Sequence, residues 1–441
     1  MRIAWFTPLS ARTGIAKYSL SAASAVSQLA DVDVWTTPRE DDYQTDLTVS
    51  DIGGLRHAAD LTGYDHVVYN LGNNPDMHAD IFDAYTRNPG VVIQHDKTMA
   101  HFMRVYYSVA HEDPSRYRDL LAYYYGAEAA AQASRQILGL GGHGGDLPLV
   151  EPCLWNATGV VVHSEDALAV VDRYPGIVPV VCIDHPFYLP IETPGSSPGR
   201  TALGIAADDI LLVSHGRIGD AKRLEQTIRA LSLLPAEARD RVRFVVAGGA
   251  HPALVERALS QARALGLGDR VRITGFLPEQ ELQAWLGAAD VFINLRYPST
   301  ESASGSLIEQ LSYTAPVVVS DIGFYATFPE GTLVRTPPAD EGTAIASALA
   351  PLILDGQLRR RIGDRTHEYA AQRFARETYA HRLIEFLDRV SASRARLSEV
   401  DAIGRGLLDV EPDGVRAEVT RGVDLLRSRG IPDMSDGGGV S

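Results

Sequence analysis

The same local pattern, a strand followed by a glycine-bearing turn and a helix, opens both halves of this sequence. The apolar segment RIAWF at 2–6 precedes a loop that contains Gly14 and a helical stretch from Ile15 to about Leu29. In the second half, DILLVSHG at 209–216 precedes RIGDAKR and a helical segment at 224–234. This unit opens the βαβ fold of nucleotide-binding domains. Its repetition predicts two Rossmann-like domains in one chain.

Further continuous apolar segments alternate with helical patterns through both halves of the chain. Strands that are apolar throughout are typical of parallel sheets covered by helices on both faces. The predicted fold class is therefore α/β, with one parallel sheet in each Rossmann-like domain. The further predicted strands are 66–70, 90–95, 158–164, 178–183, 241–249, 270–276, 289–295 and 315–321.

Composition along the chain predicts the domain boundaries. The segment LPIETPGSSPGR is rich in proline, glycine and serine, as linkers are. Two inserted helices carry clustered tyrosines, for which core packing is favoured over a wall of a substrate site. We predict an N-terminal domain at 1–190 with a helical insertion at about 98–139, a linker at 191–200, a C-terminal domain at 201–375, an amphipathic helix at 376–395, and a partly disordered C-terminal extension at 396–441.

Charge and composition limit the class of function. The formal net charge of −15 argues against nucleic acid and an anionic membrane surface as main partners. No apolar run approaches about 18 residues, so no membrane span is predicted, and the N-terminus has the pattern of a strand and loop, not of a signal peptide. Cys153 and Cys182 have neither metal-binding spacing nor a disulfide framework. The expected location is a reducing cytoplasm.

The carboxyl ends of the strands in the second half carry charged and small residues. Ligands of parallel α/β sheets bind beyond these ends. Arg217 and Lys222 follow the first strand, and a helix is expected to begin near Gly305 and Ser306. Two cations beside the free amide groups of a helix start are suited to a phosphate or diphosphate.

Two glutamates, Glu301 and Glu309, flank a small polar spacer in ESASGSLIE. Ser306 and Glu309 fit the Ser-x-x-Glu capping box, so a purely structural interpretation is open. A carboxylate can also accept hydrogen bonds from two vicinal hydroxyls. Glu309 is therefore a candidate for binding a ribose, and Glu301 for binding a hydroxylated group beyond the diphosphate. Together they predict a nucleotide-sugar ligand.

The order and spacing of these motifs resemble glycosyltransferase family 4, whose members are retaining enzymes of the GT-B fold. The resemblance covers about residues 209–325. It implies two Rossmann-like domains with parallel sheets facing each other across a cleft, the N-terminal domain on the acceptor side, and a late helix that crosses back to that domain. The motifs that carry it are HGRIGDAK (215–222), TGFLPEQEL (274–282), PSTESASGSLIE (298–309) and APVVVSDIG (315–323).

The resemblance also implies roles for individual residues. Arg217 and Lys222 would contact the diphosphate, Glu309 the ribose, and Glu301 the hydroxyls of the donor sugar. A strand-end histidine such as His95 is otherwise structural. The implied catalytic residues are His95, Arg217, Lys222 and Glu301, and the implied substrate-binding residues are Gly14, Asp96, Gly275, Phe276, Ser304, Gly305, Ser306 and Glu309.

The implied function is transfer of a sugar, of the hexosyl type, from a UDP- or GDP-linked donor to a hydroxyl of a small molecule or glycan. No cofactor or metal is expected, because the donor half has no Asp-x-Asp at a strand end and Asp208 and Asp209 precede their strand. The Ser-Ala-Ser after Glu301 departs from the family pattern and leaves the donor sugar open. The alternatives are a sugar-nucleotide 2-epimerase on the same fold and a non-catalytic nucleotide-sugar-binding partner subunit.

Overall fold

We describe the protein from a computed structural model. The structure describes residues 1–55, 58–137, 147–173, 178–187 and 200–408. The predicted linker, apart from Arg200, and most of the predicted C-terminal extension lie outside these residues. The chain forms two units, Met1–Ile384 and Glu385–Ser441, and the first unit holds both sheets.

The N-terminal domain is built on a seven-stranded parallel sheet of order β3-β2-β1-β4-β5-β6-β7. Its order reverses between β1 and β4, which is the switch point of a Rossmann-like sheet. The side chain of Thr13 accepts from the amide of Ile15 and so begins the first helix. The strands are β1 Arg2–Phe6, β2 Asp31–Thr36, β3 Thr48–Asp51, β4 His66–Leu71, β5 Gly90–Gln94, β6 Ala157–Val162 and β7 Val180–Cys182, and the main helices are α1 Gly14–Val26, α2 Pro75–Arg87 and α5 Glu165–Val171.

The C-terminal domain is built on a six-stranded parallel sheet of order β10-β9-β8-β11-β12-β13. The prediction of an α/β fold with two parallel, Rossmann-like sheets is confirmed. The strands are β8 Ile210–His215, β9 Val242–Ala247, β10 Val271–Gly275, β11 Val291–Asn294, β12 Val317–Ser320 and β13 Val334–Thr336, and the helices are α6 Leu224–Ser232, α7 Ala236–Arg239, α8 Pro252–Ala264, α9 Glu279–Gly287, α10 Gly305–Leu311, α11 Thr343–Leu354 and α12 Gly356–Arg373.

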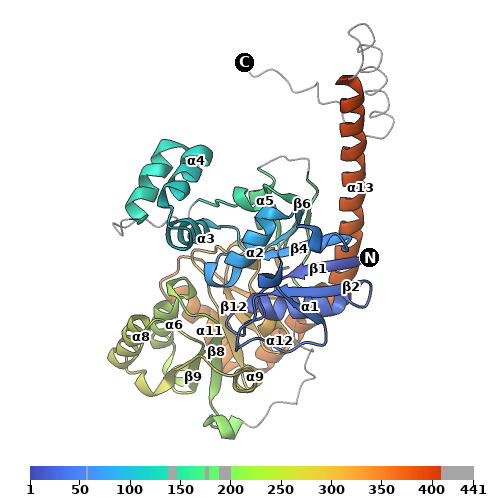
Figure 1. Ribbon diagram of the computed structural model, residues 1–441. Helices are drawn as coiled ribbons and strands as arrows, with labels where there is room; N and C mark the ends of the chain where they lie inside the picture. The colour runs from blue at the N-terminus through green and yellow to red at the C-terminus, as the bar shows by residue number, and fades with distance from the viewer. Residues whose placement is uncertain (56–57, 138–146, 174–177, 188–199, 409–441) are drawn as a thin grey trace, which may run out of the picture. The chain divides into compact units, whose positions relative to one another are not determined.

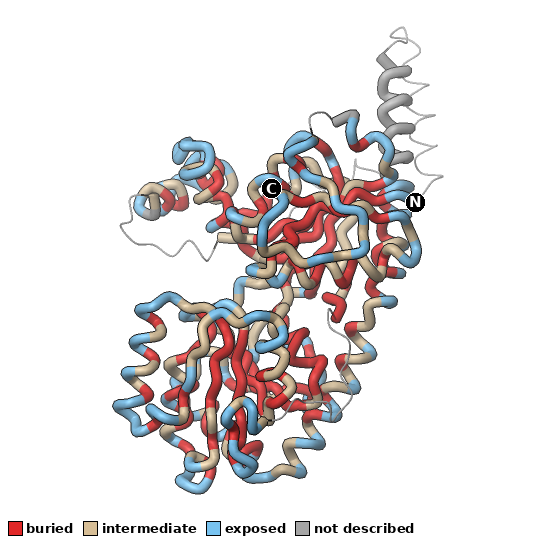
Figure 2. Tube along the Cα trace, turned by 60° about the horizontal axis from the view of Figure 1, so that its bottom comes forward, coloured by how far each residue is buried: buried red, intermediate tan, exposed pale blue. Residues whose placement is uncertain are grey.

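Helices cover both faces of the C-terminal sheet (Figure 1). Successive side chains of a strand point to opposite faces, so Leu212 of β8 packs with Ile228 of α6 while Leu211 packs with Leu307 of α10. Figure 2 shows the strands of both sheets as buried and the outer faces of the helices as exposed. Because both faces of the sheet are buried under helices, the strands must be apolar along their whole length.

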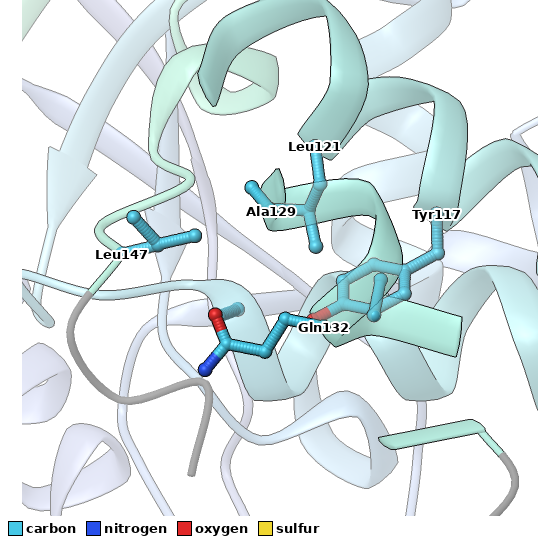
Figure 3. Close-up of a pocket in the computed structure, with 7 residues that line it drawn as sticks. Tyr117, Leu121, Ala129, Gln132 and Leu147 are labelled. Carbon is cyan, nitrogen blue, oxygen red and sulfur yellow. The ribbon is translucent and has the colours of Figure 1, made fainter. Parts of the chain in front are cut away.

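The helical insertion contains α3 Ala100–Val105, a π-helical turn at Tyr106–Ala110 and α4 Pro114–Ile137. Tyr106 and Tyr117 are buried in the N-terminal core, whereas Tyr123 is 81% exposed. Core packing, the favoured interpretation, accounts for the first two tyrosines. The insertion and Leu147 together line a small pocket (Figure 3), whose other residues are Ala100, Tyr117, Leu121, Ala129, Gln132 and Ala133.

The last helix, α13, spans Arg376–Leu408. The hydroxyl of Tyr379 in its first turn is hydrogen-bonded to the hydroxyl of Tyr18 in α1. Just before this helix, the carbonyl of Phe374 accepts from the amide of Phe187. The chain therefore contacts the N-terminal domain again after leaving the C-terminal sheet. Within the described ranges, no helix has the length and apolar character needed to cross a membrane.

Candidate active site

A cleft of about 1210 Å³ is lined by residues of both Rossmann-like domains. Most of the predicted site residues line it, although they come from segments far apart in the sequence. Those that line it are Gly14, Arg217, Lys222, Phe276, Glu301, Gly305, Ser306 and Glu309. Four others, all in the described part of the chain, do not line it: His95, Asp96, Gly275 and Ser304.

Two glycines shape the floor of the cleft where β8 and β9 end. Gly216 has a φ of +94°, a conformation that favours glycine. A Cβ atom on Gly248 would lie 1.9 Å from the carbonyl oxygen of Gly216, so the two backbones can approach only without a side chain. A Cβ atom on Gly216 would lie 3.4 Å from Nζ of Lys222. The glycine turn therefore lies against the lysine.

Lys222 is a buried cation in the cleft. Its Nζ donates to the carbonyl oxygen of His215 and lies 3.4 Å from Oγ of Ser306. Burial and the charge of Arg296 hold the pKa of Lys222 well below its usual value, although Glu301 and Glu309 counteract them. An anion bound beside this ammonium group would favour its charged form. Arg217 also lines the cleft and is exposed.

Glu309 is held from two sides. Its Oε1 lies 2.7 Å from Nζ of Lys17, and its Oε2 lies 3.0 Å from Nε2 of His215. Burial alone would raise the pKa of Glu309, but the hydrogen bond from His215 and the charge of Lys17 outweigh it and lower the pKa to about 2. The carboxylate is therefore ionised at neutral pH.

The capping-box interpretation of Ser306 and Glu309 is wrong. The helix α10 begins at Gly305, and its cap is Ser304, whose Oγ accepts from the amide of Leu307. Ser306 lies inside the first turn, and Glu309 bonds to side chains of other elements. The helix α10 is short, with only seven residues.

Glu301 is fixed through one of its two carboxylate oxygens. Oε1 accepts from Nε of Arg296 at 3.0 Å and from the hydroxyl of Tyr325 at 2.6 Å. Burial opposes ionisation, but the charge of Arg296 and the bond from Tyr325 outweigh it, so the pKa of Glu301 is lowered. The carboxylate is a charged and oriented hydrogen-bond acceptor beside the cleft.

A network of buried amides links Glu309 to Lys222. The side-chain amide nitrogen of Gln310 lies 3.3 Å from Nδ1 of His215 and donates to it. The proton of the His215 ring is therefore on its other nitrogen, Nε2, which donates to Glu309. Nδ2 of Asn294 donates to Oε1 of Gln310 at 2.7 Å and to Oγ of Ser306 at 3.0 Å. Sequence reasoning missed His215, Asn294 and Gln310, although an asparagine at the end of the apolar strand VFIN was a usable signal.

His95 and Asp96 lie at the end of β5 without entering the cleft. Nε2 of His95 lies 3.0 Å from Oδ1 of Asn70, and its ring packs 4.6 Å from the ring of Tyr18. The side chain of Asp96 accepts from the amide of Asn73 at 2.7 Å. His95 is therefore buried, whereas Asp96 is partly exposed and its backbone pairs with that of Glu301.

The cleft holds carboxylates, but they bind cations of the protein itself. Glu301 pairs with Arg296, and Glu309 pairs with Lys17. Among the residues that the structure describes, no three or more His, Cys, Asp and Glu side chains are arranged to hold a metal ion. The cleft is therefore suited to bind an anion through its cations and hydroxyls through its two carboxylates.

Part of the C-terminal half is similar to a known protein family. Residues 199–369 match the family described as Glycosyl transferases group 1. The chain is 32% identical over 164 residues to D-inositol 3-phosphate glycosyltransferase 2 of Catenulispora acidiphila. That similarity covers 34% of this chain and 37% of the relative, so the chain matches well under half of the relative's length.

Solved structures resemble nearly the whole chain. The Anabaena protein HepE in complex with UDP-glucose has a TM-score of 0.62 and 17% identity, covering 88% of this chain and all of HepE (100%). Sucrose-phosphate synthase of Thermosynechococcus elongatus has a TM-score of 0.59 and 19% identity, covering 89% of this chain and 100% of that chain. The fold of this chain is thus that of GT-B glycosyltransferase structures.

Proposed function

We propose that this protein is a glycosyltransferase that moves a sugar from a nucleoside diphosphate sugar to a hydroxyl acceptor with retention of the anomeric configuration. The observation that carries the proposal is a cleft between two Rossmann-like domains that contains buried Lys222 and the ionised carboxylates Glu301 and Glu309. The match of residues 199–369 to the Glycosyl transferases group 1 family supports it. We propose a UDP- or GDP-linked donor.

Each part of such a donor has a partner of suitable chemistry in the cleft. The diphosphate would lie at Lys222 and Arg217, where its negative charge would favour the protonated form of Lys222. The ribose would bind Glu309, and the sugar would bind Glu301. Gly14 and Phe276 line the same cleft and stay candidates for contacts to phosphate and base. Because His95 is buried against Asn70 and Tyr18, we propose no donor contact for it. Asp96, whose backbone pairs with that of Glu301, stays a candidate.

The same residues can stabilise the departing group. Negative charge grows on the diphosphate as its bond to the sugar breaks, so Lys222 and Arg217 contribute most in the transition state. These cations can perform the task that Mg²⁺ or Mn²⁺ performs elsewhere, which supports a metal-independent reaction. The lowered pKa of Glu301 makes it a weak general base. A role in binding the sugar, not in activating a hydroxyl from the opposite face, supports retention.

The alternatives gain no support from the comparisons. The matching family and the relative from Catenulispora acidiphila are both named as glycosyltransferases. None of the similar proteins reported above is named as an epimerase. A non-catalytic partner subunit would bind the donor without turning it over. Release of a nucleoside diphosphate from a nucleotide-sugar therefore separates the two remaining possibilities.

A binding screen tests the proposal without knowledge of the acceptor. Thermal unfolding is measured with UDP, GDP and ADP and their sugars, because a ligand at about 100 times its Kd stabilises the folded state by about 2.7 kcal/mol. We expect one nucleotide to stabilise the protein. Glu309→Gln should weaken that binding by about 1–3 kcal/mol, as for a lost charged hydrogen bond.

The matched control for this screen is Glu281→Gln. Glu281 lies on α9, is exposed, and does not line the cleft, so this variant should bind the nucleotide as the wild type does. If no nucleoside diphosphate stabilises the wild-type protein, the proposed function is wrong. If Glu309→Gln binds normally, the assignment of the ribose to Glu309 is wrong.

A further inference from the structure

Lys17 joins the N-terminal domain to the proposed ribose end of the cleft. It belongs to α1, and its Nζ lies 2.7 Å from Oε1 of Glu309 on α10 and 2.7 Å from Oε2 of Glu279 on α9. The Lys17 side chain is 15% exposed, and that of Glu309 is 5% exposed. One ammonium group of the N-terminal domain therefore contacts carboxylates on two helices of the C-terminal domain.

The contact with Lys17 leaves Glu309 able to bind hydroxyls. Each carboxylate oxygen has two acceptor sites. Lys17 uses one site on Oε1, and His215 uses one on Oε2. One site on each oxygen is left, which matches a pair of vicinal hydroxyls. Lys17 and His215 together fix the rotation of the carboxylate, the first from the N-terminal domain and the second from the C-terminal domain.

Stability alone is a weak explanation for this ion pair. Desolvating a lysine and a glutamate costs much of what their attraction returns, and apolar residues of similar volume often serve as well. The sequence contains only three lysines, Lys17, Lys97 and Lys222. Two of the three, Lys17 and Lys222, line the same cleft. The placement of Lys17 is thus better explained by what Glu309 binds than by the stability of the fold.

We propose that Lys17 is a positioning residue of the donor site, which orients Glu309 toward both ribose hydroxyls of a nucleoside diphosphate. Because Lys17 comes from the opposite domain, recognition of the ribose depends on the two domains being together. The inference rests on the proposed function. It adds Lys17 to the donor site and a preference for the ribose of the donor. The site should prefer ribonucleotides to 2′-deoxyribonucleotides, since the deoxy compound lacks one of the two hydroxyls.

The test is titration calorimetry that compares a ribonucleoside diphosphate with its 2′-deoxy form. The pair is UDP and 2′-deoxy-UDP, or GDP and 2′-deoxy-GDP. Wild-type protein should prefer the ribose form by about 10- to 100-fold, as for a lost hydrogen bond to a charged group. Lys17→Met leaves Glu309 held from one side only, so this ratio should fall to about threefold or less. Lys17→Arg keeps the charge and should retain most of the preference.

The chain offers a matched control in Lys97. It is also a largely buried lysine, and it pairs with Asp166 without lining the cleft. Lys97→Met therefore removes the same charge from the same domain and should leave the ribose preference unchanged. Should Lys17→Met fail to fold, Lys17→Gln removes the same charge with a shorter, polar side chain and should also lower the ratio.

Two results would overturn the inference, and they are distinguishable. A Lys17 variant that binds both nucleotides more weakly by the same factor keeps the wild-type ratio, and would show that Lys17 only ties the domains together. The proposed function would survive that result. If the wild-type protein binds neither nucleotide, the proposed function fails and the role of Lys17 fails with it.

Discussion

The backbone amide of His163 donates to the hydroxyl oxygen of Ser302 at 3.1 Å, so a buried serine of the C-terminal domain is anchored to the N-terminal domain. Two main-chain bonds flank this contact, from the amide of Lys97 to the carbonyl of Thr300 and from the amide of Ser302 to the carbonyl of His95, both at 3.0 Å. The backbone of Glu301 is thus fixed by the N-terminal domain.

The first prediction concerns Ser302→Ala. The variant leaves the buried amide of His163 without its acceptor, which costs about 1–3 kcal/mol, and it loosens the loop that carries Glu301. We expect kcat to fall by about tenfold or more while the KM for the donor changes little, because misplacement near the reacting sugar acts on the transition state. Steady-state kinetics measures both.

Ser232→Ala is the control for this prediction. Its hydroxyl bonds to the carbonyl of Arg229 on the exposed surface of α6, so kinetics and stability should stay near wild type. Wild-type kcat in a folded Ser302→Ala protein would show that Glu301 does not depend on this anchor.

The second prediction concerns the close approach of Gly248 to Gly216. In Gly248→Ala the new Cβ would lie 1.9 Å from a carbonyl oxygen, so the ends of β8 and β9 must separate. We expect a loss of about 3 kcal/mol or more in the free energy of unfolding, measured with urea. Gly249→Ala meets no atom within 4 Å and should change stability by about 0.5 kcal/mol or less. Equal effects of the two substitutions would contradict the packing described here.

The fold was largely predictable because its signal is local. Apolar strands such as RIAWF and ILLVSH, followed by glycine turns, indicate Rossmann-like units without any knowledge of tertiary contacts. The strands β2, β3 and β13 were not predicted. DVDVWT alternates polar and apolar residues, and TVSD and VRT are short, so their place in the sheets is decided by pairing with neighbours.

The site was predictable only where residues are close in sequence. Glu301 and Glu309 lie in one motif, whereas Lys17 reaches Glu309 from another domain, and no spacing in the sequence encodes that contact. The expected start of α10 near Gly305 agrees with the structure, but the alternative capping box at Ser306 does not, because Ser304 caps the helix. His95 fits a strand end, but its partners Asn70 and Tyr18 keep it in the core.

The third prediction concerns acid sensitivity. Burial lowers the pKa of His163 to about 4. Burial, and the repulsion that a second charge beside His163 would meet, lower the pKa of His185 to about 3. Both are neutral in the folded state and take up protons in the unfolded state below about pH 6.5. The unfolded state then binds more protons, so stability falls as pH drops from about 6.5 toward 4, by up to about 3 kcal/mol for His163.

The measurement is thermal unfolding of the wild type and His163→Asn between pH 7 and pH 4. Burial raises the pKa of Asp96 to about 6, so this carboxyl opposes the histidines in the same range. The difference between wild type and variant isolates His163, and we expect the variant to be less sensitive to acid. His381→Asn, at an exposed site, is the control. Parallel pH profiles for wild type and His163→Asn would contradict the prediction.

The central claim is metal-independent transfer with retention, assisted by Lys222, and donor hydrolysis tests it most directly because water replaces the unknown acceptor. The substrate is an α-linked donor chosen by the binding screen, and the reaction contains EDTA. Proton NMR records the anomeric configuration of the released sugar before it mutarotates. We expect the α-anomer to appear first, and Lys222→Ala to lower the rate by about 100-fold or more. A β-anomer appearing first, or no turnover until Mn²⁺ is restored, would contradict it.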